Sequence, residues 1–156
     1  MISTSPIFSA AALTLDKSGN AGKVVTFHDS CNVSRASRMG GVPGGQFTIP
    51  RNVIRACVNK FVDMPPETIG EATFCCGGGG GLLTDDLVEL RVKGAAPRMQ
   101  ALQQVVDEQG VNYLAAICAI CKSQFTKILP YYKHPMDMIG SVHGLVSNAI
   151  VLGPKP

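Results

Sequence analysis

The chain has no tryptophan, and only 6% of its residues are aromatic and 16% charged. Its longest apolar run lies within residues 113–121, well short of the roughly 18 residues that a membrane-spanning helix needs. No segment has the density of Lys and Arg that phosphate contacts require, and the formal net charge is only +3. We therefore expect neither direct membrane insertion nor binding to nucleic acid.

The 156 residues, 46% of them hydrophobic, are sufficient for one domain with its own core. We expect residues 1–22 to be an N-terminal tail or upstream linker and residues 23–156 to form a single domain. The apolar stretch at residues 7–15 is not preceded by Lys or Arg, which argues against a secretory signal. A domain of this size needs no disulfides, so we expect its cysteines to be reduced in the cytoplasm.

Five of the six cysteines fall into three groups: Cys31, the pair Cys75 and Cys76, and the pair Cys118 and Cys121. The groups are separated by 43 and 41 residues, so only the tertiary fold can bring them together. Thiolates gathered from distant segments usually hold a metal or perform redox chemistry. The sixth cysteine, at position 57, lies on the apolar face of a predicted helix and is interpreted as a core residue.

Strand-like and helix-like segments alternate along the chain, which predicts an α/β fold with a mainly parallel sheet flanked by helices. We expect strands at residues 24–27, 111–117 and 138–139, with a short extended segment at 73–74. Helices are expected at 54–61 behind Pro50, and at 84–93, 96–109, 122–129 and 142–152. Each cysteine group then follows a strand-like segment, so the groups should converge at the C-terminal edge of the sheet.

Local sequence also suits each cysteine pair to a charged ligand. Cys118 and Cys121 open a predicted helix, where free amide groups stabilise thiolates. Five glycines after Cys76 allow a turn, and we expect Gly77, Gly78 and Gly79 to bring backbone amides close to a bound cofactor. The run fits neither nucleotide motif, because Leu82 stands where the dinucleotide fingerprint needs glycine and no Lys–Ser/Thr follows.

Three segments resemble the cysteine-rich CCG module of the heterodisulfide reductase family, in its B/D-type subunits: residues 28–32, 74–81 and 118–121. Over residues 15–152 the likeness is strongest to the C-terminal module of its DsrK-like members. The resemblance implies a noncubane [4Fe-4S] cluster, bound by the five grouped cysteines, which would act catalytically through it: Cys31, Cys75, Cys76, Cys118 and Cys121. It further implies an oxidoreductase that cleaves or forms a disulfide or trisulfide in dissimilatory sulfur metabolism.

The same resemblance implies partners and a location. The expected partners are a DsrC-like sulfur-carrier protein and other subunits of a membrane-bound redox complex, which would place the chain in the cytoplasm, peripheral to the membrane. Family members usually carry two such modules, and this sequence has one. We therefore expect a fragment of a longer subunit that is not competent alone. The loop at residues 37–47 is also longer and richer in glycine than the family pattern.

Other interpretations remain open at this stage. Four of the cysteines could instead hold structural zinc, or the chain could be a metal-free interaction domain of a redox complex; five cysteines exceed what zinc needs. His28 is a candidate either for hydrogen bonding or proton delivery at the cofactor, or for a purely structural role at the end of a strand. Arg35, Arg38 and Lys122 could offset the negative charge of thiolates or could be solvated surface residues.

Overall fold

A computed structural model describes residues 14–37 and 45–151. Its centre is a four-stranded sheet in the order β2-β1-β3-β4, with every neighbouring pair parallel. The strands are β1 (Val24–Phe27), β2 (Lys60–Phe61), β3 (Tyr113–Ala116) and β4 (Ile139–Ser141). The predicted α/β class with a parallel sheet is confirmed.

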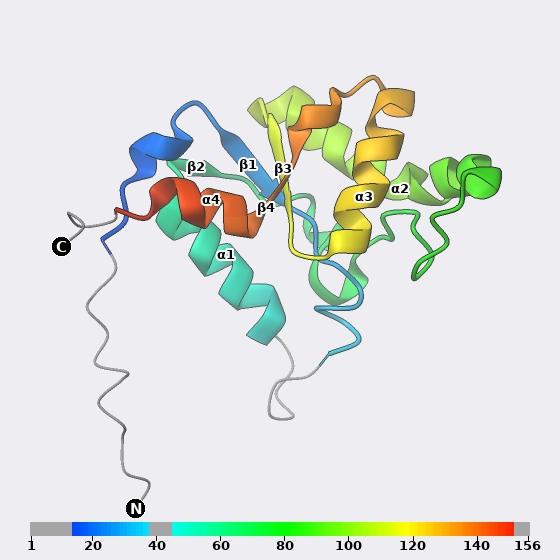
Figure 1. The fold of residues 1–156 in the computed structure, drawn as a ribbon, viewed down its shortest axis with the longest axis horizontal. Helices are drawn as coiled ribbons and strands as arrows, with labels where there is room; N and C mark the ends of the chain where they lie inside the picture. The colour runs from blue at the N-terminus through cyan, green and yellow to red at the C-terminus, as the bar shows by residue number, and fades with distance from the viewer. Residues whose placement is uncertain (1–13, 38–44, 152–156) are drawn as a thin grey trace, which may run out of the picture.

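Helices cover both faces of this sheet, as Figure 1 shows. Helices α1 (Gly45–Cys57) and α4 (Val142–Ala149) lie on one face, and α2 (Val88–Gln109) and α3 (Ala119–Ile128) lie on the other. Successive strand residues point to opposite faces, so Ala115 packs in the core with α1 and α4, whereas Leu114 and Ala116 pack in the core with α2 and α3. The molecule therefore has three layers and two apolar cores.

Short 3-10 turns connect these elements. They are η2 (Lys17–Asn20), η3 (Pro66–Thr68), η4 (Gly70–Ala72), η5 (Asp85–Leu87), η6 (Leu129–Tyr132) and η7 (Met136–Met138). Among the described helices, none has the combination of length and hydropathy that crossing a bilayer requires.

The predicted division of residues 84–109 into two helices is wrong. The two helices expected at 84–93 and 96–109 form the single helix α2, which continues through Pro97. A proline inside a helix removes one backbone hydrogen bond, but the apolar residues on either side, Ala95 and Met99, are fully buried, and this packing overrides the local preference. Thr84 does not cap α2; it precedes η5 and makes no side-chain capping bond.

Helix α1 also differs from the prediction at both ends. Pro50 lies inside α1 instead of preceding it, and Phe61 belongs to strand β2 instead of the helix. The chain leaves the helix at Cys57 because β2 pairs with β1, where the Val62 amide donates to the Val25 carbonyl over 2.9 Å. Cys57 itself is a core residue with 1% exposure, as predicted.

Residues 14–22 contact the domain. Leu15 forms an antiparallel bridge with Ile150, and buried Asn20 donates to the carbonyls of Cys57 and Leu145 over 3.1 and 2.8 Å. The remainder of the predicted tail, residues 1–13, lies outside the described residues, as do residues 38–44 of the glycine-rich loop, including Arg38. The last part of that loop, residues 45–47, is the first turn of α1.

Candidate metal centre

Two cysteine groups follow strands of the sheet at its C-terminal edge. Strand β1 leads through His28 to Cys31, and strand β3 leads to Cys118, which precedes α3. The third group was expected to follow a strand as well, and this is wrong: Cys75 and Cys76 follow η4. A side-chain bond fixes this segment instead, because the Thr73 hydroxyl donates to the Asp29 carbonyl over 2.9 Å.

The structure brings four cysteines from two distant segments to one point. The Sγ atoms of Cys76 and Cys121 and a ring nitrogen of His28 all lie within 4.8 Å of one another. Two further thiols adjoin this group, because Cys75 lies close enough to Cys76, and Cys118 close enough to Cys121, for each to change the pKa of its neighbour. All four cysteines are free thiols. The sulfurs of C-A-I-C and of the Cys75–Cys76 pair therefore form one cluster.

Cys31 is the predicted ligand that the structure does not place in this cluster. Its side chain is half-buried, and it is outside the group that His28, Cys76 and Cys121 form among the described residues. Its neighbour Ser30 reaches the cluster, since the Cys121 thiol donates to the Ser30 hydroxyl over 3.6 Å. Cys31 is therefore the sequence neighbour of a residue that contacts the cluster, but its own sulfur is not part of it.

The proximity of the sulfurs to one another changes the pKa values of their thiols. A hydrogen bond to the Cys121 thiol, together with burial, raises the pKa of Cys76 to about 12. The pKa of Cys75 is also raised, first by its bond to Cys76 and then by burial, although the amides of Gly79 and Gly77 oppose this. A metal ion bound between such thiols would deprotonate them. The donor set therefore fits a cationic occupant.

Cys118 behaves differently because it lies at the start of a helix. Burial acts to raise its pKa, but the amides of Cys121 and Ile120 and the Ser30 hydroxyl outweigh burial, so that the pKa of Cys118 is lowered. Free amide groups at a helix start stabilise a thiolate in this way. The prediction that Cys118 and Cys121 open a helix is confirmed, although α3 begins at Ala119 and not at residue 122.

His28 provides a buried nitrogen beside the sulfurs. Its side chain is 1% exposed, its ring packs edge-on against Phe125 with 5.0 Å between ring centres, and its Nδ1 has no partner among the described residues. Burial and the positive charge of Arg98 hold the pKa of His28 well below its ordinary value. A neutral imidazole has one nitrogen that can bind a metal or accept a hydrogen bond.

The glycines after Cys76 form the wall of this site. Gly77 has a φ of +85°, and a Cβ built there would stand 2.2 Å from the Arg91 carbonyl oxygen, so no other residue fits without a shift. Its amide donates to the Cys75 sulfur over 3.2 Å. A Cβ on Gly78 would stand 3.3 Å from the Cys76 sulfur. The start of the run, at Gly77 and Gly78, is therefore closely packed, whereas Gly80 and Gly81 lie in open space.

A family model described as "CCG: Cysteine-rich domain" matches residues 25–126, which include all six cysteines. The chain belongs to the CCG cysteine-rich domain family. It is 43% identical over 147 residues to the Hdr-like menaquinol oxidoreductase iron-sulfur subunit 2 of Archaeoglobus fulgidus, and 44% identical over 147 residues to the Hdr-like menaquinol oxidoreductase iron-sulfur subunit of Archaeoglobus profundus. Each alignment covers 92% of this chain and 25% of the relative, so the CCG chain spans about a quarter of their length. No solved structure matches it significantly.

Several residues of the CCG site were not predicted from the sequence. Ser30 contacts Cys121, and two buried arginines of α2, Arg91 and Arg98, lie beside the cysteine segments. The sequence does contain a signal for the two arginines. Positions 91, 95 and 98 are spaced by four and then three residues, as on one face of a helix, so both arginines share the apolar stripe of α2 with Ala95. Charged residues on such a stripe are candidates for a buried role.

Asp29 has a structural role in the CCG domain. Both of its carboxylate oxygens accept from Arg51, over 2.8 and 2.7 Å, and one also accepts from the Gly70 amide over 2.8 Å. Its side chain is fully buried. This ion pair fixes the residues after β1 against α1 and η4, and so positions His28 and Ser30.

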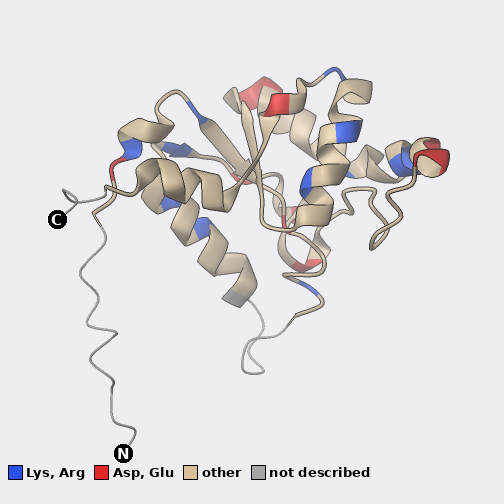
Figure 2. Ribbon diagram, viewed as in Figure 1, with Lys and Arg blue, Asp and Glu red and all other residues tan. Residues whose placement is uncertain are grey.

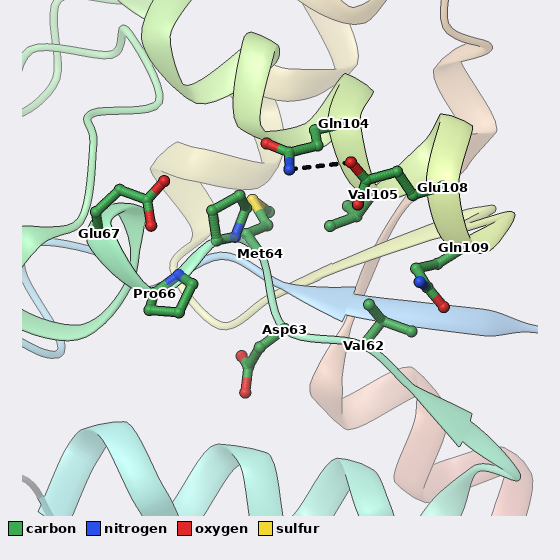
Figure 3. A pocket seen from close by; sticks show the side chains of 10 residues that line it. Val62, Asp63, Met64, Pro66, Glu67, Gln104, Val105, Glu108 and Gln109 are labelled. Carbon is green, nitrogen blue, oxygen red and sulfur yellow. Dashed lines mark hydrogen bonds between the residues drawn. The ribbon is translucent and has the colours of Figure 1, made fainter.

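A separate pocket lies away from the cysteines. Figure 3 shows that it lies between the segment after β2, with Met64 and Glu67, and the end of α2, with Gln104 and Glu108. The side-chain amide of Gln104 donates to the Glu108 carboxylate over 3.1 Å along the α2 side of the pocket. None of its lining residues is a cysteine or histidine. Lys and Arg residues are spread over several elements, as Figure 2 shows.

Proposed function

We propose that this chain is the cofactor-binding domain of an iron-sulfur redox subunit. The observation that carries the proposal is the convergence of His28, Cys76 and Cys121 at one buried point, with the Cys75 thiol beside that of Cys76 and the Cys118 thiol beside that of Cys121. The relatives named as iron-sulfur subunits support it. Zinc is the alternative occupant, and neither the family nor the names of the relatives favour it.

We assign five cysteines as ligands of a noncubane [4Fe-4S] cluster: Cys31, Cys75, Cys76, Cys118 and Cys121. An ordinary cubane cluster needs four cysteine ligands, and the fifth here, Cys31, adjoins Ser30, whose hydroxyl already contacts Cys121. The Gly77 amide donates to the Cys75 sulfur over 3.2 Å and would stabilise the thiolate that a bound cluster requires.

Such a cluster supplies one-electron transfer when bound. In the proposed reaction, a disulfide or trisulfide on a DsrC-like carrier protein is cleaved or formed; cleavage of a disulfide consumes two electrons and two protons and yields two thiols. A quinol is the proposed electron donor in that direction, because the relatives are named menaquinol oxidoreductase subunits. Other subunits of a membrane-bound complex would connect the quinol to this domain, which we place peripheral to the membrane.

The cofactor is tested by measuring iron, zinc and acid-labile sulfide per chain after anaerobic preparation, together with the visible spectrum. We expect about four iron and four sulfide per chain, as a [4Fe-4S] centre contains. One zinc per chain without sulfide would replace this proposal with a structural zinc site.

The substrate class is tested separately on the reduced, iron-loaded protein. Addition of a carrier protein bearing a C-terminal disulfide should change the electron paramagnetic resonance spectrum of the cluster, whereas the same carrier with reduced thiols should not. An identical response to the two carrier forms would reject the disulfide substrate and leave the cofactor proposal unaffected.

A further inference from the structure

Two arginines on one face of α2 are buried without an anionic partner. Arg91 is 2% exposed and Arg98 is fully buried, and their seven-residue spacing is two helical turns. Ion pairs within 4.0 Å in the described part of the chain involve Arg51, Arg55 and Lys127, but neither of these two. A buried guanidinium is costly unless negative charge lies nearby.

Arg98 is held against the segment that leads into the Cys75–Cys76 pair. It donates to the Thr73 hydroxyl over 2.9 Å and to the Thr68 carbonyl, and its guanidinium lies 5.8 Å from the centre of the Phe74 ring. These contacts are all neutral, and its Nε has no partner among the described residues. Burial lowers the pKa of Arg98 to about 10, although the charge of the Asp29 carboxylate acts to raise it. Arg98 is therefore cationic at neutral pH.

Arg91 contacts the residue that directly follows the Cys75–Cys76 pair, Gly77. Its carbonyl packs against Gly77, and its Nε donates over 2.8 Å to Gln124, which follows Cys121 by one helical turn on α3. Arg91 Nη2 and Gln124 Nε2 are both buried N–H donors without a partner in the described structure. The Arg91 guanidinium therefore also has unused hydrogen-bonding capacity beside the cysteine segments.

We propose that the buried positive charges of Arg91 and Arg98 offset the negative charge of a thiolate-bound iron-sulfur centre and raise its reduction potential. The inference rests on the proposed function. Each thiolate ligand adds negative charge, and reduction adds one more, so a nearby buried cation stabilises the reduced form more than the oxidised form. Coulomb interactions of this kind are strong in a low-dielectric interior.

The main source of positive charge to offset the thiolates is then the two buried arginines, and not the surface bases that flank the cysteines in the sequence. Arg35 is exposed, where it donates to the Glu71 carbonyl over 3.3 Å, and Lys122 is only half-buried. Charges in contact with solvent are screened by water and salt, whereas buried charges are screened much less. The two buried arginines of α2 should therefore have the larger effect on the potential.

The test is a redox titration of the anaerobically reconstituted full chain, followed by electron paramagnetic resonance. Arg98→Met removes the charge and keeps a side chain of similar length, Arg98→Lys keeps the charge, and Arg35→Met is the surface control. At the wild-type midpoint, we expect Arg98→Met to raise the ratio of oxidised to reduced cluster at least about tenfold, which is 59 mV for a one-electron couple. Arg98→Lys should restore most of the shift, and Arg35→Met should change the ratio less than about threefold on the same scale.

Iron and sulfide are measured on the same samples, so that the two proposals fail in different ways. An unchanged potential in Arg98→Met with a full complement of iron would overturn the charge assignment alone, as would an equal shift in Arg35→Met. A wild-type chain that takes up no iron and sulfide would overturn the proposed function as well. If Arg98→Met does not fold, Arg91→Met is titrated with the same expectation.

Discussion

The thiol of Cys121 lies 3.6 Å from the hydroxyl of Ser30, although the two residues are 91 positions apart in the sequence. They meet because β1 and β3 are adjacent parallel strands, so the residues that follow each strand emerge at the same edge of the sheet. The Cys75–Cys76 segment joins them through the bond from Thr73 to Asp29. This arrangement leads to four predictions that do not depend on one another.

Replacing Cys76 should disturb the cofactor, whereas replacing Cys57 should not. Cys76 belongs to the group with His28 and Cys121, while Cys57 packs in the other core, between α1 and α4. We expect Cys76→Ser to lose most of its iron and sulfide after anaerobic reconstitution, and Cys57→Ser to keep the wild-type content. Equal iron content in the two variants would show that the ligand assignment is wrong.

Alanine should be tolerated much less at Gly77 than at Gly80. Both glycines have positive φ, which costs an alanine about 1–2 kcal/mol. At Gly77 the added methyl group would also meet the Arg91 carbonyl, whereas at Gly80 nothing lies within 4 Å. We expect Gly77→Ala to lower the free energy of unfolding by about 2 kcal/mol more than Gly80→Ala. Urea denaturation followed by circular dichroism measures both, and equal losses would contradict the packing described for this turn.

Arg51 should contribute far more to stability than Arg55, although both contact Asp63. Removing Arg51 leaves the buried carboxylate of Asp29 without its cation, which typically costs about 3–5 kcal/mol. The Arg55 side chain is 52% exposed, and its replacement should change stability by less than about 0.5 kcal/mol. Urea denaturation of Arg51→Met and Arg55→Met gives the comparison. A small effect of Arg51→Met would mean that the Asp29 carboxylate is not confined as the structure shows.

The metal-free protein should lose stability as the solution becomes mildly acidic, in part through His28. The folded-state pKa of His28 lies well below its unfolded value near 6.5, so between these two values the unfolded chain binds a proton that the folded chain does not. The stabilisation is therefore complete above pH 6.5 and is lost as the pH falls toward the folded pKa. Unfolding free energies at pH 7.5 and 5 should differ less for His28→Gln than for the wild type. The same difference in both proteins would exclude this role of His28.

Much of the fold follows from patterns that are local in the sequence. The run Val24–Phe27 is a β-branched and aromatic segment and forms β1 as predicted, and the apolar run before Cys118 forms β3. These two strands sufficed to predict where Cys31 and Cys118 would lie relative to the sheet. The elements that were predicted wrongly, α2 across Pro97 and β2 at Phe61, are those in which tertiary packing or strand pairing overrides the local preference.

The sequence indicates His28, the cysteines of the candidate site and the glycines behind Cys76. The spacing of the cysteines and the glycines behind Cys76 indicate a cofactor, but the buried cations do not show in such a motif. Arg91 and Arg98 occupy core positions of α2 that ordinarily hold apolar residues, and only the fold places them beside the cysteine segments. The surface bases flanking the cysteines in the sequence were the natural candidates, yet Arg35 is exposed. A base that is close to a cysteine in the sequence is therefore not necessarily a buried charge close to it in the fold.

The central claim is that cysteines from three remote segments hold one iron-sulfur centre. Anomalous scattering at the iron edge, from crystals grown without oxygen, tests it most directly. We predict one compact group of iron atoms bonded to the sulfurs of Cys75, Cys76, Cys118 and Cys121, with Cys31 as the fifth ligand. Iron density away from these sulfurs, or a single zinc atom in its place, would contradict the account.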